Sequence, residues 1–111
     1  MSTVAMTRTV VVVGSRPRAR AAEILGDVRP GEETAVYVLG LDPTPAQRRL
    51  TGEALAIAAE RRFVLTAELV GDPTGLRERL REGDEVRVFA RARESRRWRV
   101  EQGLGVNAPG A

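Results

Sequence analysis

Four segments rich in β-branched and apolar residues alternate along the chain with segments of helical character, and this alternation limits the possible folds most strongly. The four segments are residues 9–13 (TVVVV), 35–41 (AVYVLGL), 63–70 (FVLTAELV) and 85–90 (EVRVFA). The first two are almost wholly apolar, which is typical of strands covered on both faces of a parallel sheet. Since strands that alternate with helices form parallel crossovers, the sequence predicts an α/β fold: a mostly parallel sheet of four to five strands with helices on both faces.

The clearest helix start in the chain lies at Thr44. Thr44 is placed as the N-cap, Pro45 occupies the first helical position, and Gln47 stands where it completes a capping box. We expect this helix to run to about Arg61, with an apolar stripe of small side chains against the sheet.

The other helix signals are weaker. Ser15 is placed to cap a helix that ends near Gly26, and Asp72 or Thr74 can cap a short helix that ends at Gly83. Beyond the fourth strand the alternation stops, so the residues that follow are expected to form an edge strand or a packed tail.

A chain of 111 residues with 42% hydrophobic residues fits one compact domain. We therefore expect a single α/β domain over residues 1–111, with residues 1–8 and 103–111 flexible. The sequence contains neither a long apolar run nor a secretion signal, so we expect a cytoplasmic protein without a membrane partner.

Cysteine and histidine are both absent. Their absence removes disulfides, thiol nucleophiles, the usual zinc sites and the commonest general base. Asp42 and Asp72 follow strands, where a paired-carboxylate metal site is conceivable, but helix capping explains each aspartate more simply. We therefore expect no metal site and no cofactor.

All eighteen cationic residues are arginine, and six of them fall between Arg87 and Arg99 with Glu94 as the only acid among them. This density predicts a positive patch at one end of the molecule. Guanidinium groups bind phosphate through two parallel hydrogen bonds, so the patch is a candidate site for a nucleic-acid backbone or a nucleotide. The candidate residues are Arg91, Arg93, Arg96, Arg97 and Arg99, with Trp98 as a residue that could stack on a base.

A structural role also explains the same residues. The arginines could pair with Glu94 and Glu101, or lie over Trp98, at a solvated rim. Trp98 could likewise cover the end of the core instead of a base.

A second candidate is the turn Gly14-Ser15-Arg16, which follows the first strand. Backbone N–H groups at such a turn can bind an anion, and Arg16 would add positive charge. The arrangement is similar to that of small Rossmann-like nucleotide-binding proteins, but it lacks their Gly-x-Gly-x-x-Gly pattern. A tight turn with a serine cap is the alternative.

Residues 35–97 resemble the catalytic domain of serine recombinases, the resolvase and invertase family, in the order and spacing of their features. Residues 37–41 (YVLGL) stand in the place of the family's Tyr-x-Arg-x-Ser motif, and residues 92–96 (ARESR) in the place of Asp-Arg-Leu-x-Arg. The resemblance implies a resolvase-like α/β fold and a site that holds a DNA phosphate.

The chain departs from the family at the reactive positions. Leu41 replaces the nucleophilic serine, Leu39 the first-strand arginine and Ala92 the aspartate, which leaves only Arg93 and Arg96. Leucine has no oxygen that can attack phosphorus, so the resemblance implies a pseudoenzyme without catalytic residues.

Three functional hypotheses follow from these features. The first is a non-catalytic, resolvase-like protein that contacts nucleic-acid phosphates through the arginine cluster. The second is a homo-oligomeric interaction or assembly module that uses a sheet edge or the small-residue helix at 45–61. The third is a small nucleotide-binding protein that uses the Gly14-Ser15-Arg16 turn.

Overall fold

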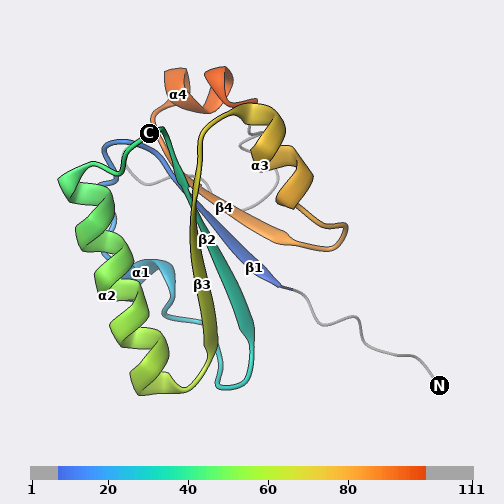
Figure 1. Cartoon of the computed structure of the whole chain (residues 1–111). Coiled ribbons are helices and arrows are strands. Elements are labelled where there is room, and N and C mark those ends of the chain that lie inside the picture. The colour runs from blue at the N-terminus through green and yellow to red at the C-terminus, as the bar shows by residue number, and fades with distance from the viewer. Residues whose placement is uncertain (1–7, 100–111) are drawn as a thin grey trace.

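A computed structural model of the chain describes residues 8–99 and has the predicted α/β fold (Figure 1). Four strands form one all-parallel sheet in the order β3-β2-β1-β4. The elements in chain order are β1 (Thr9–Val13), α1 (Ala21–Ile24), β2 (Glu33–Leu39), α2 (Pro45–Arg61), β3 (Val64–Val70), α3 (Pro73–Arg79), β4 (Glu85–Phe89) and α4 (Ala92–Arg97). Residues 8–99 contain no fifth strand. The expectations for residues 1–7 and 103–111 lie outside the described residues.

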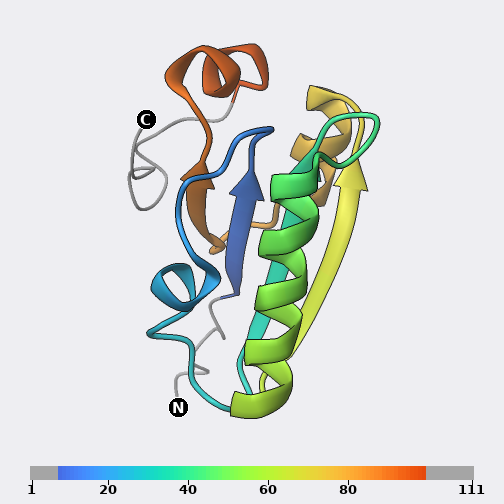
Figure 2. The same ribbon diagram turned by 90° about the vertical axis from the view of Figure 1, so that its left-hand side faces the viewer.

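Helices cover both faces of the sheet, and α4 lies across one end of it. Helices α1 and α2 pack on one face and α3 on the other, whereas α4 lies beyond the carboxyl ends of the strands (Figures 1 and 2). The chain builds outward from β1 to β2 and β3, and then returns to place β4 on the opposite side of β1. The strand order therefore reverses between β1 and β4, the kind of position where open parallel sheets bind ligands.

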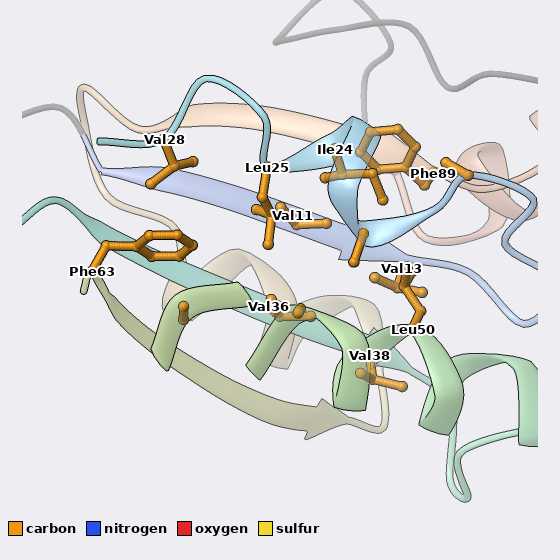
Figure 3. Close-up of a cluster of buried hydrophobic side chains, with 14 residues drawn as sticks. Val11, Val13, Ile24, Leu25, Val28, Val36, Val38, Leu50, Phe63 and Phe89 are labelled. Atoms are coloured by element: carbon orange, nitrogen blue, oxygen red, sulfur yellow. The ribbon is translucent and has the colours of Figure 1, made fainter. Parts of the chain in front are cut away.

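Strand β1 is buried on both faces, as its apolar sequence predicts. Val11 and Val13 join the cluster under α1 and α2 (Figure 3), while Val10 and Val12 join the cluster under α3. Successive side chains of a strand point to opposite faces, so one run of valines serves both layers of the core. This double burial fixes β1 as a central strand.

The predicted start of α2 is confirmed in detail. The Thr44 hydroxyl accepts a hydrogen bond from the Gln47 N–H at 3.1 Å, and the Gln47 side chain accepts one from the Thr44 N–H at 2.8 Å. The Gln47 side-chain nitrogen also donates to the carbonyls of Val13 at 3.1 Å and Leu39 at 3.0 Å. Gln47 is fully buried, so one amide group satisfies the buried carbonyls of Val13 and Leu39 and the half-buried N–H of Thr44.

Three of the helices differ from the sequence prediction. Helix α1 has only four residues, and its N-cap is Arg20, so the prediction that Ser15 caps it is wrong. The region after β4 forms the short helix α4 instead of an edge strand. Helix α3 begins as predicted with Asp72, whose carboxylate accepts from the Gly75 N–H at 2.7 Å, but it ends at Arg79, before Gly83.

Arg8 is the last residue of the segment that we expect to be flexible, and its side chain is buried. Its guanidinium donates to both carboxylate oxygens of Asp84, at 3.1 and 2.7 Å, and also to the Tyr37 hydroxyl and the Arg79 carbonyl. Burial alone would raise the pKa of Asp84, but hydrogen bonds from Arg8 and from the Arg81 N–H hold it below its usual value. The ion pair ties the start of β1 to the turn before β4.

The role of Gln47 can be tested by Gln47→Leu, which keeps the volume of the side chain but removes its amide. The carbonyls of Val13 and Leu39 and the Thr44 N–H would lose their partner. We expect the free energy of unfolding to fall by about 2–4 kcal/mol, because each orphaned buried group costs roughly 1–3 kcal/mol. Urea denaturation followed by circular dichroism measures the change.

A matched control is Thr34→Val, since the Thr34 hydroxyl is fully buried and has no hydrogen-bond partner among the described residues. This variant should be as stable as the wild type or more stable by up to about 1 kcal/mol. Equal losses in both variants would contradict the assigned role of Gln47.

The Arg8–Asp84 pair predicts a loss of stability in acid. Because the pKa of Asp84 is lower in the folded chain than its ordinary 3.8, the pair stabilises the fold above that pH. This stabilisation is lost as pH falls below 3.8 and through the lower pKa of the folded chain. Asp84→Asn should lower stability at pH 7 by less than the roughly 3–5 kcal/mol of a broken buried pair, since asparagine still accepts from Arg8.

The diagnostic result is the slope of stability against pH. Urea midpoints from pH 7 to pH 2 should fall less steeply in Asp84→Asn than in the wild type. The exposed Asp42→Asn serves as the control and should keep the wild-type slope. An unchanged slope in Asp84→Asn would show that other carboxylates dominate acid unfolding.

Candidate functional site

Helix α4 lies where the strand order reverses, at the carboxyl ends of β1 and β4 (Figure 2). It begins after the buried residue Ala90, and Arg91 is its N-cap. The position follows directly from the topology, because β4 pairs in parallel with β1 and both strands end at the same edge. The helix therefore stands over the loop that leaves β1.

Glu94 anchors α4 to that loop. The Ser15 N–H donates to both Glu94 carboxylate oxygens, at 3.1 and 3.0 Å, and the Ser15 hydroxyl lies 3.5 Å from one of them. Gly14 makes this approach possible: a Cβ added there would lie 2.3 Å from Glu94 Oε1 and 2.7 Å from the Ala90 Cβ. The Gly14 N–H also donates to the Phe89 carbonyl at 3.0 Å. The chain's own carboxylate thus occupies the Ser15 N–H that the sequence suggested for an external anion.

The other end of α4 is anchored in the core. Ser95 is buried, and Trp98 belongs to the hydrophobic cluster under α3 with only 9% of its surface exposed. Trp98 therefore covers the end of the core. Its ring is buried, which argues against the alternative that it stacks on a base. With Glu94 bound at its first turn and Trp98 packed after its last, α4 is held on the sheet at both ends.

The arginines of α4 and its flanks remain on the surface. Arg91, Arg93, Arg96, Arg97 and Arg99 are all exposed. None of their guanidinium groups makes a hydrogen bond or ion pair with another residue of the described part of the chain. Since Glu94 binds the Ser15 N–H, the one acid within the group does not pair with them. The five arginines form what we call the α4 arginine surface.

Arg87 does not belong to this surface, although it opens the arginine-rich stretch of the sequence. It is buried in β4, and its guanidinium forks onto both carboxylate oxygens of Asp27, each at 2.7 Å. It also donates to the Ile24 carbonyl and pairs with Glu85. The hydrogen bonds from Arg87 hold the pKa of Asp27 below its usual value. Arg87 is a structural residue that ties α1 to β4.

Further arginines lie at the same end of the sheet but come from other segments. Arg16 and Arg18 are exposed on the loop after β1, and Arg48 and Arg49 are exposed in the first turns of α2. Sequence order alone does not group Arg18, Arg48 and Arg49 with the α4 cluster, because more than forty residues separate them from it. The predicted topology does imply that these arginines lie near α4, since the carboxyl ends of parallel strands meet at one edge of the sheet.

Carboxylates are scarce at this end of the molecule. The loops and helix starts there contain Asp42, Asp72 and Glu94, of which Asp72 caps α3 and Glu94 binds Ser15. Within residues 8–99 no three acidic side chains gather as metal ligands would. The same residues include no helix long and apolar enough to cross a bilayer.

The positions that resemble serine recombinases are placed as follows. Leu41 is 85% exposed just beyond β2, whereas Leu39 is buried, and Arg93 and Arg96 lie on the exposed side of α4. Strand β1, which lies outside the resemblance, separates β2 from β4, the two strands that lead to the compared motifs. Neither a protein-family model nor a curated protein nor a solved structure matches the chain, so the resemblance depends on these residues alone.

Proposed function

We propose that the chain binds the phosphate backbone of nucleic acids through the α4 arginine surface and does not cleave the strand. The observation that carries the proposal is that Arg91, Arg93, Arg96, Arg97 and Arg99 are exposed together without a carboxylate partner in the described chain. Several unpaired guanidinium groups on one surface repel one another, and a polyanion relieves that repulsion by releasing its counterions.

The contrast with the other arginines supports this interpretation. Arg8, Arg79 and Arg87 each have a carboxylate partner within hydrogen-bond distance. The chain therefore contains acids that neutralise arginines where the fold requires it, and few of those acids lie near α4. Arg16 and Arg18 extend the positive surface onto the neighbouring loop, which gives a backbone more than one row of contacts.

The positions of the aromatic residues favour backbone contacts over base stacking. The four aromatic residues of the chain, Tyr37, Phe63, Phe89 and Trp98, are all buried. Single-strand binding proteins usually offer exposed aromatic rings on which bases stack. A surface of arginines without rings suits the regularly spaced phosphates of a duplex, and its binding should be independent of sequence.

The resemblance to serine recombinases supports the same ligand on separate grounds. Arg93 and Arg96 occupy positions whose arginines hold the scissile phosphate in that family, while Leu41 occupies the position of the nucleophile. A leucine side chain cannot form a covalent phosphodiester intermediate. We therefore propose binding without strand cleavage.

The proposal is tested by Arg93→Gln, Arg96→Gln and Arg97→Gln combined in one variant. Fluorescence anisotropy with a mixed-sequence labelled DNA duplex, repeated over a range of salt concentrations, measures affinity and salt dependence. Because each lost phosphate contact reduces the slope of log K against log salt by about 0.9, the variant should lose up to about 2.7 of that slope. We expect at least a tenfold weaker affinity at the lowest salt, by about 1.4 kcal/mol or more.

The matched control changes Arg29, Arg62 and Arg81 to glutamine, which removes the same charge from exposed positions at the opposite end of the sheet. This control should keep most of the affinity and the salt slope. Equal weakening in both triple variants would mean that net charge alone drives binding. No binding to the wild type at low salt would refute the proposed function.

A single-stranded competitor of the same sequence distinguishes backbone binding from stacking. Since no aromatic ring is exposed, we expect the duplex to compete at least as well as the single strand at equal nucleotide concentration. Strong preference for the single strand would contradict the assignment of the ligand as duplex backbone.

A further inference from the structure

The two edges of the sheet are unequally protected. Strand β4 is five residues long and is buried except at Glu85, whereas β3 is seven residues long and has five exposed residues. Among residues 8–99, no strand pairs with the outer side of β3. An open strand edge presents unpaired N–H and C=O groups and is a template for another strand.

The usual protections of an edge strand are absent from β3. Its sequence, VLTAELV, contains no proline, glycine, lysine or arginine. The single charge, Glu68, is compensated by Arg79, whose Nε donates to Glu68 at 2.7 Å. Monomeric proteins normally place uncompensated charges or prolines on such an edge to prevent pairing.

An apolar groove runs beside this edge on the face that carries α2. Thr51, Gly52 and Leu55 of α2 form one wall, and Ala67 and Leu69 of β3 form the other. The charged residues Arg48 and Glu68 also line the groove. Leu55 is 47% exposed and Leu69 is 40% exposed. Of the four large hydrophobic side chains that are exposed within residues 8–99, three lie on β3 or face it from α2.

We infer that two copies of the chain associate through their β3 edges, in antiparallel orientation, about a twofold axis at Ala67. In this register Leu65 of one copy faces Leu69 of the other on the groove side. On the opposite side Glu68 faces Thr66, so no two like charges oppose each other. The strand is therefore self-complementary, as an interface about a twofold axis must be.

The groove selects the antiparallel arrangement. A twofold axis perpendicular to the sheet places both α2 helices on the same face, and the two grooves join into one apolar channel that Leu55 of each copy fills. A parallel arrangement would place the two α2 helices on opposite faces of the joined sheet, so the two grooves would not meet. The resulting sheet has eight strands, and each β3 becomes a central strand.

The charge distribution favours the same arrangement. Antiparallel pairing reverses the strand direction, so the α4 arginine surfaces of the two copies lie at opposite ends of the dimer. Their mutual repulsion is then small, because exposed charges separated by more than about 10 Å are largely screened at 0.1 M salt. The dimer interface and the proposed phosphate surface do not overlap, and each can be tested without the other.

The test uses charge exchange at the twofold axis. Ala67 is exposed in the monomer, so Ala67→Glu and Ala67→Arg should both fold. In the dimer, however, each substitution places two like charges against one another. By sedimentation equilibrium, the wild type should have twice the 12.1 kDa mass of the chain, and each variant alone should be monomeric. An equimolar mixture of the two variants should recover the dimer, because glutamate then faces arginine.

Controls separate folding from association. Both variants should keep the far-ultraviolet circular dichroism of the wild type. Ala56→Glu changes an exposed alanine of α2 that does not line the groove, and this variant should remain dimeric. A wild type that is monomeric at the highest soluble concentration, a dimeric Ala67→Glu, or a mixture that stays monomeric would each overturn the inference.

Discussion

The carboxyl end of the sheet depends on the buried amide of Gln47. Strands β1 and β2 leave their ladder at Val13 and Leu39, where α2 also begins, and three backbone groups would be orphaned there without a partner. Leaving one buried backbone group without a hydrogen bond costs a substantial fraction of the free energy of unfolding of a small domain. One side chain satisfies all three groups and so allows two central strands to end where the longest helix begins.

The surface that we propose to bind phosphate is built outward from this point. Thr44, which caps α2 with Gln47, also donates to the Ser15 carbonyl at 2.8 Å. The Ser15 N–H then binds Glu94, and Glu94 positions the first turn of α4. Each step joins groups far apart in the sequence, so the orientation of the α4 arginines depends on contacts that contain no arginine. A six-residue helix would not be stable alone in water, and these anchors supply what its length lacks.

The parts of the fold that were predictable depend on local interactions. The capping box of α2 joins residues three apart, and the burial of β1 follows from a run of valines, so both were evident from the sequence. The failures involve distant partners. Arg8 binds Asp84, which is 76 residues away, and Ser15 binds Glu94, which is 79 residues away. The local sequence around Arg8 or Ser15 gives no sign of either contact. Helix α4 has an arginine-rich sequence without an apolar stripe, and only its contacts with the loop after β1 and with the core reveal it.

The candidate site shows the same division between local and distant information. Arg87 and Arg93 lie six residues apart in one arginine-rich stretch of the sequence, yet Arg87 is buried against Asp27 while Arg93 is exposed. Arg87 and Arg93 differ in the number of carboxylates near them, because the carboxylates concentrate at the amino end of the sheet and in the outer turns. Guanidinium groups stay charged throughout the physiological pH range, so this imbalance persists wherever the fold is stable. A molecule with a small net charge of +3 can therefore still present one strongly positive end, and its field would orient that end toward a polyanion before contact.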